Sequence, residues 1–407
     1  MSVYLLATLD TKLIEAAFVR DRLAALDVDV RIVDTGCLGS PGIVADVTRE
    51  QVFAAAGDSL ADALAANDRG RAVASAAAGA ARLIEVLYQR GQVSGVIAIG
   101  GSAGTTIGTA AMRALPLGVP KLMVSTLASG QVRHYVGDKD ILMLNSVTDI
   151  SGLNRISRSV LDTAARAMAG MVKSPRAPAA AKGDEKPLVA ATMFGVTTPC
   201  VQRAREILET AGYEVLVFHA TGNGGQAMES LIAEGLIAGV LDITTTELAD
   251  ELVGGVLSAG PKRLTAAARA GVPQVVSVGA TDMVNFHARA TVPAQFVGRN
   301  LYQHNASVTL MRTTAEENAA IGAEIGRKAS AATGPAAILL PLRGVSAIDR
   351  AGQPFDDPPA RAALFAAIRA TAGPIEIMEM DCHINDPAFA DAAAAKLLQL
   401  MQVRSAT

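Results

Sequence analysis

The chain has 407 residues, which exceeds the size at which a single hydrophobic core stops growing, so two domains are expected. Half of the residues are hydrophobic, with 37 glycines, 3% aromatic residues and no Trp, a composition typical of α/β sheets packed by small-residue helices. A net charge of −3, no Lys/Arg stripe and few rings for base stacking argue against a nucleic-acid partner.

The cysteines and the amino terminus indicate where the protein works. Cys37, Cys200 and Cys382 are widely spaced and form no CxxC motif, which favours a reduced, cytoplasmic compartment. The start MSVYLLATLDTK has no basic segment and reaches charge at Asp10 and Lys12, so it reads as a first strand rather than a signal peptide. No apolar run reaches membrane-spanning length, and we expect a soluble protein with no membrane partner.

The first elements follow a strand–helix–strand order. Residues 3–9 form a predicted buried strand, a helix follows from Asp10-Thr11-Lys12, and 30–33 form the next strand, which together predict a parallel sheet. Residues 37–68 interrupt this alternation with weakly patterned helical sequence; a flap, an interaction arm and a plain insertion all stay open. A helix over 70–90 leads to the next strand.

The stretch 93–112, VSGVIAIGGSAGTTIGTAAM, reads as strand, glycine turn and helix. Glycines let backbone N–H groups approach a ligand, and the N–H groups at the start of a helix favour an anion, most often phosphate. The turn matches neither GxxxxGK[ST] nor GxGxxG, so no fingerprint identifies the ligand, and a plain tight turn is the alternative. Its predicted ligand-binding residues are Gly100, Gly101, Ser102, Gly104, Thr105 and Thr106.

Two neighbouring loops carry similar chemistry. After the first strand, Lys12 is suited to a phosphate and Asp10 to a ribose hydroxyl or Mg²⁺, whereas a capping Asp beside a solvated Lys is the alternative. A strand over 120–125 ends in a small, hydroxyl-rich loop. If strand 3–9 pairs with the strand that begins at Val93, these loops and the glycine turn face one crevice. The loop residues assigned to the nucleotide are Asp10, Thr11, Lys12, Ser125, Thr126, Ser129 and Gly130.

The segment 174–187, SPRAPAAAKGDEKP, has the composition of a linker. A strand over 140–147 and a helix over 154–172 precede it. We therefore predict an N-terminal domain over 1–173, a linker over 174–187 and a C-terminal domain over 188–407.

The same order of strand, polar loop and helix resumes after the linker. The fold class is therefore α/β, with two Rossmann-like, doubly wound, mainly parallel sheets flanking a cleft. The strands are predicted over 188–193, 213–219, 239–243, 274–278, 308–311, 336–340 and 375–380. The helices are predicted over 200–211, 226–234, 262–270, 315–331, 359–371 and 387–401.

The loops that follow these strands supply candidate substrate-binding and catalytic residues. Anion-cradling glycines and hydroxyls, with a guanidinium as a carboxylate or phosphate clamp, predict contacts to a small anionic metabolite. The substrate-binding candidates are Phe194, Gly195, Thr197, Thr198, Thr221, Gly222, Asn223, Gly224, Thr244, Thr245, Thr246 and Arg312. Asp242, Glu247 and His287 are the candidate acid/base groups, with 282–287 as a polar loop.

Several single residues have competing interpretations. Cys200, at a helix start, is either a thiol of depressed pKa or, preferably, a buried core residue. His219 suits a ligand or a sheet-rim contact equally, and His383 is taken as a solvent-facing loop residue. Metal-ligand spacings such as HExxH are missing, so no protein metal site is predicted. The GGSAG match to GxSxG is formal, since a nucleophilic Ser102 needs a histidine, the nearest in sequence being His134.

Longer segments resemble a known family. They are IGGSAGT, LPLGVPKLMVSTLASG, SVTDISGLNRIS, MFGVTTPCV, FHATGNGG, LDITTTELADELVGG and HNASVTLMRTT. They resemble a bacterial and fungal family of unassigned function that is similar to the N-terminal ATP-binding domain of the tomato mosaic virus resistance protein. The resemblance spans nearly the whole chain. It implies two Rossmann-like subdomains around a cleft, self-association as a homodimer or higher homo-oligomer, and ATP as the ligand.

Three functions follow from these observations. The first is a cytoplasmic ATP-binding protein that holds the phosphates on 100–106, assisted by Lys12 or Ser129 and with Mg²⁺ as a further cofactor. The second is an enzyme, of hydrolase, transferase or isomerase type, acting on a small anionic metabolite in a cleft between the domains. The third is a regulatory or assembly module that uses ATP to hold its oligomer.

Overall fold

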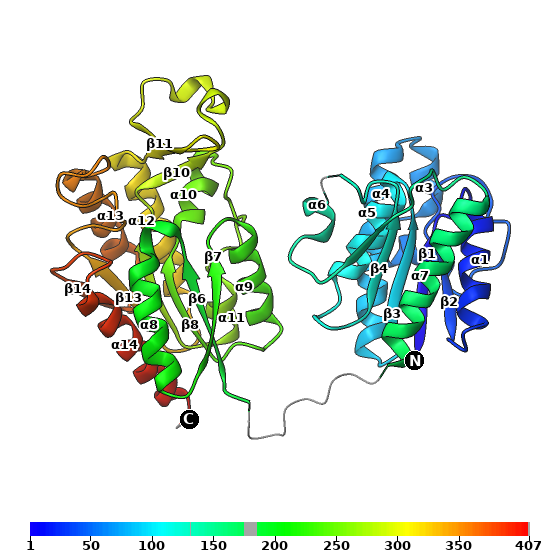
Figure 1. The fold of residues 1–407 in the computed structure, drawn as a ribbon, viewed down its shortest axis with the longest axis horizontal. Helices are drawn as coiled ribbons and strands as arrows, with labels where there is room; N and C mark the ends of the chain where they lie inside the picture. Colours follow the sequence, from blue (N-terminus) through cyan, green and yellow to red (C-terminus); the bar gives the residue numbers. More distant parts are fainter. Residues whose placement is uncertain (131, 175–184, 406–407) are drawn as a thin grey trace. The chain divides into compact units, whose positions relative to one another are not determined.

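A computed structural model describes residues 1–130, 132–174 and 185–405. By its internal contacts the chain divides into two compact units, Met1–Ala179 and Ala180–Thr407 (Figure 1). Most of the predicted linker, 175–184, lies outside the described residues. Within the described ranges, no helix has both the length and the apolar character that crossing a bilayer requires.

Unit 1 contains a five-stranded, fully parallel sheet in the order β2-β1-β3-β4-β5. Its strands are β1 (Ser2–Ala7), β2 (Val30–Asp34), β3 (Val93–Gly100), β4 (Lys121–Ser125) and β5 (Leu142–Asn145). Its helices are α1 (Leu13–Ala24), α2 (Arg49–Ala56), α3 (Leu60–Ala65), α4 (Arg69–Gln89), α5 (Ser102–Arg113), α6 (Arg133–Val136) and α7 (Arg155–Lys173).

Alternate residues along each strand of unit 1 enter two different cores, as the period of two requires. On β3, Val96 and Ala98 pack in the core formed with α4 and α5. Ile97 and Ile99 pack in the core formed with α1 and α7. The sheet is therefore covered by helices on both faces, which makes unit 1 a doubly wound α/β fold (Figure 1).

Unit 2 has a six-stranded parallel sheet in the order β14-β13-β9-β8-β6-β7. Its strands are β6 (Leu188–Met193), β7 (Glu214–His219), β8 (Gly239–Thr244), β9 (Gln274–Gly279), β13 (Ala336–Pro341) and β14 (Glu376–Met380). Its helices are α8 (Thr198–Thr210), α9 (Asn223–Ala233), α10 (Thr246–Val253), α11 (Ala266–Ala270), α12 (Ala315–Ser330), α13 (Pro358–Thr371) and α14 (Pro387–Ser405). Both faces again pack against helices, so the α/β, Rossmann-like class predicted from the sequence is confirmed.

Three local predictions for unit 2 are wrong. The segment 282–287, expected as a polar loop, contains β10 (Met283–Phe286), which pairs antiparallel with β12 (Val308–Arg312) in a separate sheet with β11 (Leu301–Asn305). The strand predicted over 308–311 belongs to this small sheet rather than to the parallel one. The helix predicted over 262–270 begins only at Ala266, because Leu264 has a φ of 67°, outside the helical region.

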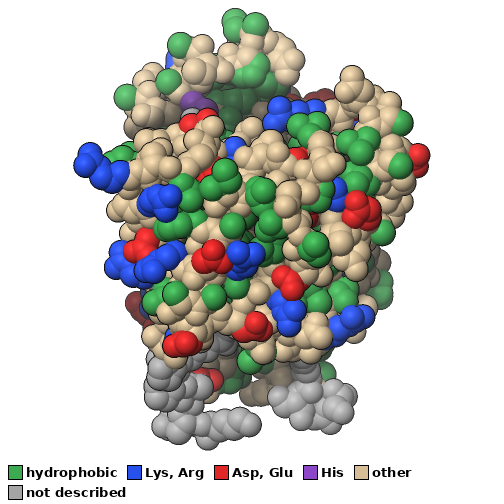
Figure 2. All heavy atoms as spheres, turned by 90° about the vertical axis from the view of Figure 1, so that its right-hand side faces the viewer, with side chains coloured by type: hydrophobic (Ala, Val, Ile, Leu, Met, Phe, Trp, Pro, Cys, Tyr) green, Lys and Arg blue, Asp and Glu red, His purple; other side chains and the backbone are tan. Residues whose placement is uncertain are grey.

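Charged side chains on the face shown in Figure 2 are interspersed by sign rather than gathered into one basic or acidic patch. Ion pairs also join opposite charges in unit 1, for example Arg22 with Asp162 at 2.6 Å. The arrangement agrees with the net charge of −3 and offers no extended cationic track for a polyanion on that face.

Candidate functional site

The strand order of unit 1 places a topological switch point between β1 and β3. From β1 the chain moves to β2 on one side and then returns to β3 on the other, and both pair with β1 in parallel. Ligands of open α/β sheets bind outside the carboxyl ends of the strands at such a point. The pairing that the sequence analysis made a condition, between the first strand and the strand from Val93, is confirmed, so the turns after β1 and β3 follow neighbouring strands at the carboxyl end of the sheet.

The glycine turn after β3 is shaped by two close backbone approaches. A Cβ atom on Gly100 would lie 2.8 Å from Gly104 Cα, and one on Gly104 would lie 3.0 Å from the Ile99 carbonyl oxygen. These two glycines are therefore needed for the strand to turn directly into α5. Gly101 differs, because a Cβ there would meet only Thr126 Oγ1, at 3.7 Å. Among the described residues, no other atom therefore fills the space where a Cβ of residue 101 would lie.

The hydroxyl groups predicted around this turn divide into two sets. Thr105 Oγ1 lies 2.6 Å from Ser125 Oγ, and both side chains are buried, so this pair joins the turns after β3 and β4. Thr106 Oγ1 donates to the Ser102 carbonyl within α5. The Ser102 and Ser129 side chains are exposed and Thr126 is half-buried. The side chains of Ser102, Thr126 and Ser129 are therefore the ones that can reach a ligand.

The amino terminus of α5 is uncapped. Among the described residues, no side chain accepts a hydrogen bond from the N–H groups of Ser102, Ala103 or Gly104, and the cap residue Gly101 has no side chain to offer. The first N–H groups of a helix have no partner within the helix, and the helix dipole makes this end positive. The start of α5 is thus able to accept an anion.

The turn after β1 is tight, with the N–H groups of Thr11 and Lys12 both donating to the Thr8 carbonyl. Thr11 is exposed, Asp10 and Lys12 are half-buried, and Lys12 caps α1 without a side-chain hydrogen bond. Asp10 Oδ2 accepts from the Leu38 N–H at 2.7 Å, which connects this turn to the segment after β2. The structure therefore brings Asp10, Thr11 and Lys12 to the edge that carries the glycine turn.

Sequence reasoning missed a buried ion pair at the carboxyl end of β2. Asp34 Oδ2 accepts from Arg49 Nε at 2.7 Å, and the two side chains are 1% and 3% exposed. Asp34 Oδ1 accepts from the N–H groups of Leu9 and Gly36. Because Arg49 lies 15 residues after Asp34 in an interrupted stretch, no spacing rule identifies the pair. It fixes the chain beside the turn after β1.

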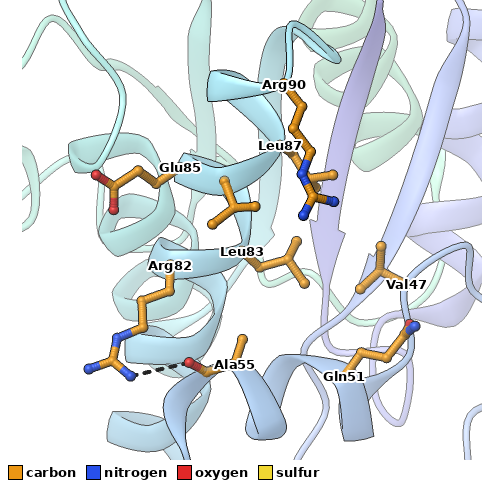
Figure 3. Close-up of a pocket in the computed structure, with 9 residues that line it drawn as sticks. Val47, Gln51, Ala55, Arg82, Leu83, Glu85, Leu87 and Arg90 are labelled. Atoms are coloured by element: carbon orange, nitrogen blue, oxygen red, sulfur yellow. Dashed lines mark hydrogen bonds between the residues drawn. The ribbon is translucent and has the colours of Figure 1, made fainter.

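Unit 1 has one hollow toward the amino ends of its strands and one toward their carboxyl ends. A groove of about 530 Å³ between α2 and α4 is lined by Val47, Gln51 and the second half of α4 (Figure 3). Because α4 runs into the start of β3, this groove lies toward the amino edge. A hollow of about 320 Å³ is lined by Asp34, Arg49 and the loop 41–45. It lies at the carboxyl edge, where ligands of this fold bind, and its size is within the range of about 300–1,000 Å³ of ligand pockets.

Unit 2 repeats the switch point, here between β6 and β8, but fills it with its own side chains. Asp242 and Glu247, two of the candidate acid/base groups, both contact Arg263, at 2.6 Å in each case. All three side chains are essentially buried. Burial alone would lower the pKa of Arg263, but the two carboxylates raise it well above its ordinary value. Arg263 therefore acts as a permanent cation at the centre of the cluster, and the sequence analysis had not singled it out.

Glu247 also occupies the start of α9. Its Oε1 accepts from the N–H groups of Gly222 and Gly225, at 2.7 and 3.1 Å. A Cβ on Gly225 would lie 2.3 Å from Glu247 Oε2. Burial raises the pKa of Glu247, and the Arg263 charge opposes that shift. The turn 221–224, predicted to hold a substrate anion, thus already holds the carboxylate of the chain itself.

The threonines predicted to bind substrate also have internal partners. Thr197 Oγ1 lies 2.8 Å from Thr244 Oγ1, and Thr245 Oγ1 donates to the Ser277 carbonyl at 2.9 Å. Thr246 lies within reach of Asn285 Nδ2, at 3.4 Å. These side chains are buried, so they join strands and helices of unit 2 to one another.

The remaining candidates of unit 2 are dispersed. His287, past the end of β10, is exposed and, among the described residues, makes no hydrogen bond or ion pair with Asp242 or Glu247. Arg312 is 5% exposed and donates to the Phe355 carbonyl and to Thr313 Oγ1, so its guanidinium is held by the protein rather than presented to a ligand. Thr198 Oγ1 donates to the Phe194 carbonyl, while Gly195 is exposed.

Two single-residue interpretations are decided by burial. Cys200 is 1% exposed and burial raises its pKa to about 12, so the core reading is right and the depressed-pKa alternative is wrong. His383 is 3% exposed, with Nε2 at 2.8 Å from the Ser346 carbonyl oxygen and Nδ1 accepting from the Asn385 N–H. The expectation of a solvent-facing loop histidine is therefore wrong, because this loop folds back onto the core.

Comparison with known proteins identifies relatives over the whole chain. Residues 1–177 match the family described as "Uncharacterised protein family (UPF0261) N-terminal domain", and residues 186–401 match its C-terminal domain. A UPF0261 protein of Clostridium tetani is 50% identical over 402 residues, covering 98% of this chain and 99% of that protein. A UPF0261 protein of Rhizobium meliloti is 49% identical, covering 97% of each. The tomato ToMV resistance protein Tm-1(GCR237) is 43% identical over 342 residues, covering 82% of this chain and 45% of that protein.

Proposed function

The chain belongs to the uncharacterised family UPF0261, and we propose that its unit 1 binds a nucleotide with the phosphates on the glycine turn 100–106. The observation that carries this proposal is the uncapped start of α5 at the β1/β3 switch point. Three N–H groups there lack a side-chain acceptor, and they lie at the edge of the sheet where doubly wound folds bind ligands.

The residues around the turn fit a polyphosphate. Gly101 leaves space on the side of Thr126, and Lys12 adds a positive charge from the neighbouring turn. Ser102 and Ser129 are exposed hydroxyls that can donate to phosphate oxygens. ATP is the nucleotide that the family resemblance implies, and Mg²⁺ bound to its phosphates is the further cofactor that we propose.

Calorimetric titration of the purified full chain with ATP, with and without Mg²⁺, tests the proposal. We expect Gly101→Val to weaken ATP binding at least tenfold, since the added methyl groups occupy space that the fold leaves open. Gly170→Val is the matched control, because a Cβ there meets nothing within 4 Å and α7 carries no candidate residue. No heat of ATP binding under either condition, or a Gly101→Val variant with the affinity of the unmodified protein, would reject the proposal.

A further inference from the structure

We infer that the carboxyl end of β2 selects a ribonucleotide over a deoxyribonucleotide, through Arg49 and Asp10, which both lie close to Gly36. This inference rests on the proposed function, since it assigns the sugar of the nucleotide whose phosphates lie on the glycine turn. It adds a specificity determinant, which neither the turn nor the family description provides.

Arg49 has one guanidinium nitrogen without a partner. Its Nε donates to Asp34, and its Nη1 donates to the carbonyl oxygens of Leu38 and Gly39. Nη2 is buried and makes no hydrogen bond to any acceptor among the described residues. A buried donor without an acceptor is energetically costly, and the other two nitrogens of this guanidinium donate to the protein. We therefore expect Nη2 to donate to a group of the ligand.

A glycine lies next to Nη2. A Cβ atom on Gly36 would lie 2.7 Å from Arg49 Nη2 and 2.8 Å from Asp10 Oδ2, so any larger residue would overlap both groups. A guanidinium donor and a carboxylate acceptor thus both lie close to this glycine. A hydroxyl group both accepts and donates, so it is the ligand group that satisfies the two together.

The charges at this point favour a hydroxyl over a second phosphate. Asp34 already neutralises Arg49 at 2.7 Å, and Asp10 contributes a further negative charge. A phosphate there would meet two carboxylates and one guanidinium. A sugar hydroxyl carries no charge, and it gains two charge-assisted hydrogen bonds.

The distance between the two sites suits one nucleotide. In the sheet β1 separates β2 from β3, so the ends of β2 and β3 lie two strand spacings apart, about 10 Å. A phosphate chain bridges that separation across the turn after β1, where Lys12 lies. The hollow lined by Asp34, Arg49 and the loop 41–45 adjoins the same ion pair and offers the base a place at this edge.

The experiment compares ATP, 2′-deoxy-ATP, 3′-deoxy-ATP and inorganic tripolyphosphate by calorimetry on the full chain. For the unmodified protein we expect ATP to bind about tenfold or more tighter than at least one deoxy analogue, the order expected for a lost charge-assisted hydrogen bond. Gly36→Ala fills the space, and Asp10→Asn replaces one carboxylate oxygen with a donor while it keeps an acceptor for the Leu38 N–H. In both variants the preference should fall to within twofold, with tripolyphosphate affinity unchanged.

The controls separate this inference from the proposed function. Gly170→Ala should alter no affinity, and thermal unfolding of each variant reports whether it is folded. Gly101→Val should weaken tripolyphosphate as well as ATP, which tests the phosphate site alone. Equal affinity for ATP and both deoxy analogues, or a preference that survives both Gly36→Ala and Asp10→Asn, overturns the sugar assignment and leaves the phosphate site intact. Binding of neither ATP nor tripolyphosphate overturns both proposals.

Discussion

The two units of this protein share one strand order but treat the switch point in opposite ways. In unit 1 the order β2-β1-β3 leaves the start of α5 without a side-chain acceptor. In unit 2 the order β7-β6-β8 is the same, but Glu247 from the first turn of α10, the helix after β8, reaches across to the start of α9, the helix after β7, and Arg263 holds this carboxylate in place. A glycine-rich turn before a helix is therefore no evidence for a ligand by itself, because a protein can supply the anion from its own chain.

The largest effect that this comparison predicts is on Glu247→Ala. The change leaves the N–H groups of Gly222 and Gly225 without their acceptor and removes one of the two nearest carboxylates from Arg263, whose side chain is 0% exposed. Breaking a buried ion pair costs about 3–5 kcal/mol, and we expect unit 2 to lose that much stability. Amide hydrogen exchange of peptides from β8 and α9 measures the loss within unit 2.

The control for this substitution is Glu206→Ala on the exposed side of α8, which should change stability by less than about 0.5 kcal/mol. An unaltered exchange rate in Glu247→Ala would contradict a structural role for this carboxylate. ATP binding by unit 1 should be retained in the same variant.

A smaller effect is expected from pH, again in unit 2. Burial raises the pKa of Asp250 to about 7, although Asn285 donates to it from its side chain at 2.7 Å. The folded state thus binds a proton that the unfolded state releases near its ordinary pKa of 3.8. The stability of unit 2 should fall as the pH rises from about 4 to 7, with the full loss present above 7.

Asp250→Asn removes this titrating group at nearly constant shape. Between pH 5 and pH 8 the variant should lose less stability than the unmodified protein, by on the order of 2 kcal/mol, since one pKa unit corresponds to about 1.4 kcal/mol. Hydrogen exchange of α10 peptides at the two pH values measures the difference. Parallel losses in the two proteins would show that Asp250 is charged in the folded state.

Sequence patterns anticipated the regular parts of this molecule because those parts follow local rules. The apolar run before Gly100 and the small-residue run after it predict β3 and α5 without any other information. The position of Asp10 and Lys12 just after the first strand was predictable for the same reason. The pairing of β1 with β3 was only a condition in the sequence analysis, because the order of elements along the chain does not decide which strands are neighbours in the sheet.

The charged contacts were not predictable, because they depend on where distant segments meet. Arg263 approaches Glu247 and Asp242 from a loop that precedes a short helix, and the sequence there reads as an ordinary helical stretch. Arg49 reaches Asp34 from an interrupted region without clear periodicity. Asp242 and Glu247 were predicted as candidate acid/base groups, but whether such carboxylates face a ligand or an internal arginine is decided by packing alone.

The last comparison uses a matched pair of alanine substitutions at glycines in the two turns, and it includes the smallest effect that we expect. A Cβ on Gly225 would lie 2.3 Å from Glu247 Oε2, and Glu247 is fixed by its other partners. Gly225→Ala should therefore destabilise unit 2 by about 1–3 kcal/mol, as overpacking does. A Cβ on Gly101 would meet only Thr126 Oγ1, at 3.7 Å, and the φ of Gly101 is −81°, which any residue adopts. Gly101→Ala should change the stability of unit 1 by less than about 0.5 kcal/mol.

Thermal unfolding and hydrogen exchange of the two alanine variants decide whether the turns differ as described. If Gly101→Ala destabilises unit 1 as much as Gly225→Ala destabilises unit 2, other atoms of unit 1 pack against Gly101. The turn after β3 then has no space for a phosphate. If Gly101→Ala is stable but binds ATP more weakly than the unmodified chain, the missing Cβ at Gly101 serves a ligand rather than the fold. The glycine of unit 2 would then be retained for an internal carboxylate, and the glycine of unit 1 for an external phosphate.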